Sequence, residues 1–174
     1  MIELKIRSKA EIKAKAEVGF NGDFFQIIPY SISMVNYAEP SAAVFYLAAD
    51  VGDDVLGRSV RLAFDESKVV SPEKFQEVFA SGKIQEAARE RVKVAMQKYG
   101  YKSKMALLKN MMCCWISMSE KVVQIKPTHH KTIDGYSGIS VDGDEILHLP
   151  SSATDEEIGN AVREGIRRCT SAIR

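Results

Sequence analysis

The sequence lacks the features that direct a chain into or across a membrane. It has no basic segment followed by an apolar run near its start, so we expect no signal peptide. No apolar stretch reaches about 18 residues, the length that a membrane-spanning helix requires. Cysteines are few: Cys113, Cys114 and Cys169 make an odd count with one adjacent pair, which suits a reducing compartment better than a disulfide framework. These absences predict a cytoplasmic protein without a membrane partner.

The usual motifs for metals, phosphates and catalysis are also missing. The histidines and the cysteine pair have no CxxC or HxxxH spacing, and adjacent residues of a strand face opposite sides, so we expect no metal site. The run 142–145 lacks the residue order of a calcium loop, and the run 138–142 has Asp where a nucleophile elbow requires Gly. The glycines form neither GxGxxG nor a P-loop. We therefore expect no cofactor and no catalytic residue. The enzyme alternative is a small hydrolase that uses the Asp, His and Ser residues of the central box of the sequence.

What is present is an ordinary globular composition with an uneven spread of charge. The 174 residues are 45% hydrophobic and 27% charged, with a net charge of +1, which fits one domain. Residues 68–131 hold 13 Lys or Arg against 5 Asp or Glu, whereas residues 132–162 hold 7 acidic residues and no Lys or Arg. The basic middle could bind nucleic acid, but its lysines alternate with glutamates on an amphipathic pattern, which favours a solvated helix face.

Much of the chain occurs twice. At an offset of 102 positions, Asp53 matches Asp155, Gly57 matches Gly159 and Arg61 matches Arg163. At an offset of 98, the run 26–29 matches 124–127. Self-similarity of this kind indicates a repeated structural unit. We predict repeat halves at about 14–66 and 111–169, joined by a helical connector at about 71–109, within a single domain spanning 1–174.

The local patterns predict an α+β domain with a central, largely antiparallel sheet flanked by helices. Alternation at 2–6 and the apolar run 43–48 indicate strands, the latter buried; the pairs 16–20 with 24–28 and 111–118 with 122–126 indicate hairpins. We expect Pro29 to end the first pairing or kink its strand. Another strand is expected at 145–150. Helices are expected from Asp53, from Pro72, over 84–99, over 103–109 and after Thr154, whose pairing with Glu157 makes a capping box.

The acidic region carries the candidate binding site. Asp134, Asp142, Asp144 and Glu145 cluster in sequence near Tyr136. Carboxylates beside an exposed aromatic side chain suit docking to a basic protein surface, with steered association and the tyrosine as an anchor. The alternative is that 134–138 is a structural segment, in which Asp134 caps the turn and Tyr136 packs in the core.

Three segments in the last third of the chain carry a resemblance to a known family. They are Lys131-Thr132-Ile133-Asp134-Gly135-Tyr136-Ser137-Gly138, Leu147-His148-Leu149-Pro150 and Asp155-Glu156-Glu157-Ile158-Gly159. Together they resemble the CdiI family of contact-dependent growth inhibition immunity proteins. One departure is Tyr136, which stands where the family more often has Trp.

The resemblance implies a small cytoplasmic antidote that binds the C-terminal toxin domain of a CdiA-type effector and blocks its active site. It also implies that the toxin is a nuclease, in some cases a metal-dependent DNase, and that a toxin β-hairpin adds to the sheet of the immunity protein in some members. An acidic patch would complement the positive surface of a nuclease, so Asp134, Tyr136, Asp142, Asp144 and Glu145 are the expected toxin-binding residues. No residue is implied to be catalytic.

Overall fold

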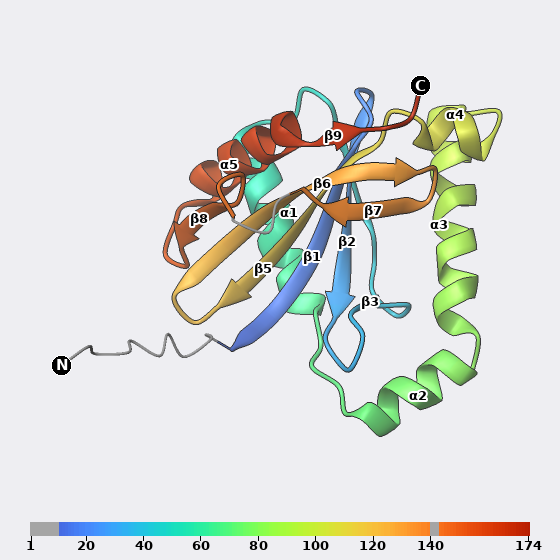
Figure 1. Cartoon of the computed structure of the whole chain (residues 1–174), viewed down its shortest axis with the longest axis horizontal. Helices are drawn as coiled ribbons and strands as arrows, with labels where there is room; N and C mark the ends of the chain where they lie inside the picture. Colours follow the sequence, from blue (N-terminus) through green and yellow to red (C-terminus); the bar gives the residue numbers. More distant parts are fainter. Residues whose placement is uncertain (1–10, 140–142) are drawn as a thin grey trace.

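The computed structural model describes residues 11–139 and 143–174, which form an α+β domain around one curled sheet (Figure 1). The strand expected at 2–6 lies outside the described residues. The central strand order is β3-β2-β1-β5-β6-β7; β4 also pairs with β2, and β8 and β9 also pair with β6. All of these pairings are antiparallel except that of β9. The strands are β1 (Ile12–Phe20), β2 (Phe24–Ser31), β3 (Tyr37–Ala38), β4 (Phe45–Ala48), β5 (Met112–Ser119), β6 (Val122–Thr132), β7 (Gly135–Gly138), β8 (Leu147–Pro150) and β9 (Thr170–Ser171).

Five helices flank this sheet in the described part of the chain. They are α1 (Asp53–Glu66), α2 (Pro72–Ala80), α3 (Lys83–Tyr99), α4 (Lys104–Leu108) and α5 (Asp155–Arg168). Ser71 caps α2, Gly100 ends α3 in the left-handed conformation, and the predicted capping box of Thr154 and Glu157 is formed at α5. Helices α1 and α5 pack on one face, whereas α3 and α4 approach the other (Figure 1).

The two halves of the sheet have matching registers. Gln26 pairs with Tyr46 across β2 and β4, and the equivalent Gln124 pairs with His148 across β6 and β8. Where the halves meet, Glu17 of β1 pairs with Trp115 of β5, and these two residues are themselves 98 positions apart. The same offset of 98 converts the residue pair on one side of them into the pair on the other side. A pseudo-two-fold axis therefore passes near the Glu17–Trp115 pair, and the predicted repeat of strand, turn, strand and helix is seen in the fold.

The same symmetry governs the crossing of α1 and α5. Gly57 lies against the backbone of Asp155, and Gly159 lies against the backbone of Asp53. Arg61 donates from Nε to Asp155 Oδ1 at 3.0 Å, and its counterpart Arg163 donates to Asp53 Oδ1 at 2.6 Å. Each guanidinium also donates to carbonyl groups just before the other helix, those of Ala153 and Val51 respectively. The two helix starts are thus held together by a pair of equivalent arginine clamps.

Two local predictions differ in part from the structure for a shared reason, which is the position of the edge strands. Pro29 does not end β2, since the pairing with β1 continues through Tyr30. Pro29 occupies the gap between the segment of β2 that pairs with β4 and the segment that pairs with β3, where a missing N–H costs little. The expected buried strand at 43–48 is β4, which is shorter and half-buried because it lies at an edge.

The main core lies between the sheet and the pair α1 and α5. It contains the apolar residues that alternate along β1 and β5 and the inner faces of both helices, including Val18, Ile116, Leu56 and Ile158. A second, smaller cluster lies on the opposite face, where Phe24 stacks on Tyr99 of α3 with ring centroids 3.9 Å apart. Both faces of the sheet are therefore used, but the second is only partly covered.

Candidate functional site

Asp134 and Tyr136 lie together at the hairpin that joins β6 to β7. The carboxylate of Asp134 is exposed and pairs with the ammonium of Lys104 in α4 at 2.9 Å. The ring of Tyr136 stacks on His130 with centroids 4.5 Å apart, and its hydroxyl donates to the carbonyl of Met111 at 3.1 Å. Burial raises the pKa of Tyr136. Tyr136 is thus half-buried rather than an exposed aromatic, and Asp134 pairs with a helix rather than capping the turn.

Asp144 and Glu145 lie after β7, in a turn next to the end of α5. Asp144 is exposed, whereas Glu145 is half-buried and its carbonyl accepts a hydrogen bond from Arg168 at 3.2 Å. The Glu145 Oε2 atom is buried and has no hydrogen-bond partner among the described residues. Asp142, the remaining carboxylate of the predicted cluster, lies outside the described residues. The structure therefore anchors Asp134 to α4 and Glu145 to α5, at opposite ends of β7.

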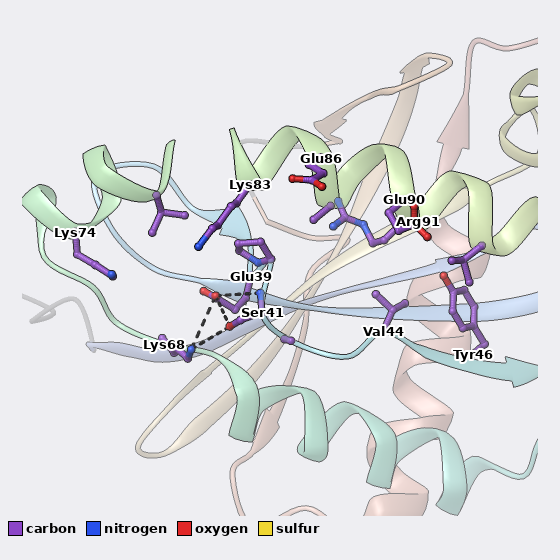
Figure 2. A pocket seen from close by; sticks show the side chains of 15 residues that line it. Glu39, Ser41, Val44, Tyr46, Lys68, Lys74, Lys83, Glu86, Glu90 and Arg91 are labelled. Atoms are coloured by element: carbon purple, nitrogen blue, oxygen red, sulfur yellow. Dashed lines mark hydrogen bonds and ion pairs between the residues drawn. The ribbon is translucent and has the colours of Figure 1, made fainter. Parts of the chain in front are cut away.

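A hollow of the described surface lies under the connector. We use "arm" for α2 and α3. None of the residues of α2 is buried, and Ala95 is the only buried residue of α3. The arm is attached near its two ends: Phe75 contacts Tyr37 of β3 at a centroid distance of 5.5 Å, and Tyr99 stacks on Phe24. Between these attachments the arm spans a cavity of about 900 Å³, which we call the arm cleft (Figure 2).

The walls of the arm cleft carry both charges and apolar side chains. From the sheet side come Glu39, Val44 and Tyr46, and from the arm come further groups (Figure 2). Burial raises the pKa of Glu39, but hydrogen bonds from Ser31 and Ser41 outweigh it, so the net pKa is lowered. The lining groups on the arm are Lys74, Val78, Lys83, Glu86, Ala87, Glu90, Arg91 and Val94.

A second cavity, of about 380 Å³, lies between α3, α4 and the sheet, and we call it the inner cavity. Arg91 lines both cavities, so they meet at this side chain. On the floor of the inner cavity is Glu17, the residue of β1 at the pseudo-two-fold axis, whose Oε2 atom accepts a hydrogen bond from the hydroxyl of Tyr30 at 3.1 Å. Asp134 and Tyr136 line its other side.

The inner cavity perturbs the groups that line it. Burial raises the pKa of Glu17, and the hydroxyl of Tyr30 and the guanidinium of Arg91 only partly offset this effect. The carboxylate of Glu17 in turn raises the pKa of Tyr30. Burial raises the pKa of the Cys113 thiol as well. A cavity that contains perturbed titratable groups is a candidate binding site on physical grounds.

Glu17 was not predicted as a site residue, because this residue alternates with Lys13 and Lys15 and resembles a solvent-facing residue of an edge strand. Trp115, which pairs with it, was equally inconspicuous. The partial exposure of this tryptophan, 36%, and the ring contact with Lys126 at 5.9 Å become visible only in the folded chain. The feature of the sequence that could have pointed to this pair is the repeat, because its symmetry axis passes near Glu17 and Trp115.

The residues of the hydrolase alternative lie apart. His130 is buried, with Nε2 on the carbonyl of Ile133, while His129 contacts Thr170 at 2.7 Å. His148 is exposed in β8. Within residues 11–139 and 143–174, no group of three or more His, Cys, Asp or Glu side chains is arranged to hold a metal ion. No helix in the same ranges is long and apolar enough to cross a membrane.

Comparisons with known proteins agree on one family. The family model described as CdiI, CDI immunity protein, matches residues 14–169. Immunity protein CdiI-YPIII from Yersinia pseudotuberculosis serotype O:3 (strain YPIII) is 30% identical over 168 residues, which cover 90% of this chain and 95% of that protein.

Two solved structures share the fold. A chain of the CdiA-CT/CdiI toxin and immunity complex from Yersinia pseudotuberculosis matches with a TM-score of 0.82 at 28% identity, covering 92% of this chain and all of that one. The protein of unknown function NMB0488 from Neisseria meningitidis matches with a TM-score of 0.82 at 25% identity, covering 90% of this chain and 94% of that one.

Proposed function

The chain belongs to the CdiI family of CDI immunity proteins, and we propose that it binds and neutralises the C-terminal toxin domain of a cognate CdiA-type effector in the cytoplasm. The observation that carries the proposal is the match along almost the whole chain to a protein solved in a complex of toxin and immunity protein. Such a function requires a binding surface and no catalytic group.

The arm cleft and the inner cavity are the surfaces best suited to receive the toxin. They are concave and contain apolar side chains between charged ones, and the arm cleft lies beside the short edge strands β3 and β4. An extended segment of a toxin could add to such an edge, where backbone groups are open for pairing. The mixed charge of the walls suits a protein segment better than a nucleic acid, which would meet repulsion from the glutamates.

The finer part of the proposal is that the toxin is a nuclease. Such an enzyme must present a positive surface to phosphate groups, and exposed carboxylates on its inhibitor would attract that surface and speed association. Asp134 and Asp144 are exposed in the structure, and Glu145 lies next to Asp144. Tyr136 contributes by holding the hairpin that presents Asp134.

The test of the function is rescue from growth arrest. The chain is expressed in cells that produce a CdiA-type C-terminal toxin domain, beginning with the toxin encoded next to it. We expect survival with that toxin and none with unrelated toxins, together with co-purification of the two proteins. Death of the cells despite stable expression of both proteins would refute the immunity role, and a nucleic-acid cleavage assay of the isolated toxin tests its class.

The carboxylates are tested by removing their charge. The quadruple variant Asp134→Asn, Asp142→Asn, Asp144→Asn and Glu145→Gln should associate with the toxin at least about tenfold more slowly at low salt, because steering depends on these charges. The difference should shrink in high salt, where charges are screened. The matched control neutralises four exposed carboxylates elsewhere: Asp50→Asn, Asp65→Asn, Glu66→Gln and Glu120→Gln. Equal association rates for the two variants would show that the region 134–145 does not steer the toxin.

A further inference from the structure

Glu17 is a half-buried carboxylate that forms no ion pair in the described structure. It lines the inner cavity from the centre of the sheet, and its hydrogen bonds come from neutral donors: the hydroxyl of Tyr30 at 3.1 Å, the indole of Trp115 and the thiol of Cys113. The positive charge of Arg91 lowers the pKa of Glu17 across the cavity, but the two side chains form no ion pair. Arg91 also makes no ion pair or hydrogen bond to other described residues. In the free protein only neutral donors and the unpaired Arg91 thus act on this carboxylate, and together they only partly offset the effect of burial.

The fold itself gains nothing from this charge. Desolvation of a carboxylate is unfavourable unless a cation or several donors compensate for it. A glutamine side chain would fit the same space and could accept the hydrogen bond from Tyr30 through its amide oxygen. Nothing in the packing around Glu17 therefore requires a carboxylate in place of an amide.

The chemistry of the cavity walls indicates which kind of group could compensate for the charge of Glu17. Val78 and Val94 of the arm and Val44 and Tyr46 of the sheet side offer apolar contacts along the arm cleft, and these lead to Arg91 and the inner cavity. Exposed glutamates alternate with basic residues along the same walls, which disfavours a polyanion and suits a polypeptide. A long basic side chain has the apolar stem and the charged end that this path to Glu17 requires.

We propose that Glu17 receives a Lys or Arg side chain from a segment of the toxin that enters the arm cleft, and that this pairing contributes to the choice of partner. The inference rests on the proposed function, because it takes the toxin as the occupant. A partner without a cation at this point would leave the Glu17 carboxylate buried and unpaired in the complex, and unpaired buried charges discriminate strongly between partners.

The experiment compares Glu17→Gln with Glu66→Gln, which makes the same chemical change at an exposed residue of α1 on the opposite face of the sheet. Binding of each full-length variant to the cognate toxin domain is measured by calorimetry and by association and dissociation kinetics. We expect Glu17→Gln to weaken binding by about 30-fold or more, mainly through faster dissociation, since it leaves the cation of the toxin unpaired in the interface. Glu66→Gln should bind as the unmodified chain does.

Thermal unfolding of the same variants separates recognition from a structural role. Glu17→Gln should raise the melting temperature at neutral pH, whereas removal of a carboxylate that the fold needs would lower it. Individual Lys→Gln and Arg→Gln variants of the toxin then complete double-mutant cycles with Glu17→Gln, and one of them should show a strong coupling.

The outcomes are distinct for the two proposals. If the unmodified chain and Glu66→Gln fail to bind the toxin, the proposed function is refuted, and this inference fails with it. If both bind and Glu17→Gln binds equally well, only the inference about Glu17 is overturned. A dimer of the free chain that Glu17→Gln dissociates would show that a second copy fills the cleft, and would also overturn it.

Discussion

Replacing Gly57 with alanine tests the crossing of α1 and α5 because two effects of opposite sign act on this residue. Helix propensity alone predicts a gain, since alanine is better than glycine by about 1 kcal/mol in a helix interior. Against this, a Cβ atom on Gly57 would lie well under 3.0 Å from backbone atoms of Asp155, closer than side-chain carbons approach any backbone. The backbone cannot turn aside as a side chain can, so the two helices must move apart.

The size of the loss follows from these two terms. Overpacking of this kind costs about 3 kcal/mol at the upper end of its usual range, and subtracting the propensity gain of about 1 kcal/mol leaves a loss of about 2 kcal/mol or more. In a protein of this length each kcal/mol lowers the melting temperature by about 2–4 °C, so we expect a fall of about 4–8 °C in thermal unfolding. Gly159→Ala should behave in the same way, because its Cβ would meet the backbone of Asp53.

The control is Gly165→Ala in α5. There the new Cβ would lie 2.8 Å from Ile125 Cγ2 and 3.0 Å from Cys114 Sγ, which are side-chain atoms that can shift, so the loss should be smaller. The double variant at Gly57 and Gly159 should lose less than the sum of the single losses, because the first substitution already separates the helices. A rise in the melting temperature of Gly57→Ala would refute the close crossing.

Two further predictions concern charged side chains. Arg61→Ala and Arg163→Ala should each lower the free energy of unfolding by about 1.5 kcal/mol, because each variant loses charge-assisted hydrogen bonds that are only partly exposed. Chemical denaturation should show equal losses for the two variants. The control is Arg58→Ala, whose side chain is 61% exposed and whose removal should leave the stability unchanged. Glu17→Gln should raise the melting temperature at neutral pH, and the gain should vanish below about pH 4.5, the ordinary pKa of a glutamate. Burial raises the pKa of Glu17 in the folded state above its value in the unfolded chain. The unmodified protein therefore has its full stability below about pH 4.5 and loses stability as the pH rises through the raised pKa of Glu17. A gain in Glu17→Gln that does not depend on pH would contradict this.

The local structure could be predicted because its causes lie close together in sequence. The hairpin at Asn21-Gly22-Asp23, the caps of α2 and α5 and the glycine that ends α3 each depend on a few adjacent residues. The repeat was visible because the second half keeps the clamp residues of the first, such as Arg61 and Arg163. The α+β class with its antiparallel sheet followed from these elements and is confirmed.

The cavities could not be predicted because their causes lie far apart in sequence. Whether Glu17 faces water depends on α3, which begins at Lys83, and on how far the arm stands from the sheet. Nearness in sequence was misleading for the carboxylates as well. Asp134 and Glu145 are separated by few residues, yet β7 lies between them and each is anchored to a different helix. Such placement is decided by tertiary packing.

The arm has a consequence for how this protein can diversify. It is inserted once into a doubled scaffold, so a fold with two equivalent halves offers a single cleft, and we expect one toxin per chain. Its helices bury almost nothing, and most of its side chains can therefore be exchanged at little cost in folding. The glycine crossing and the arginine clamps, which hold the scaffold, lie on the other face. Homologues that bind different toxins could therefore change the residues of the arm at little cost in stability, while the residues at the crossing of α1 and α5 stay the same.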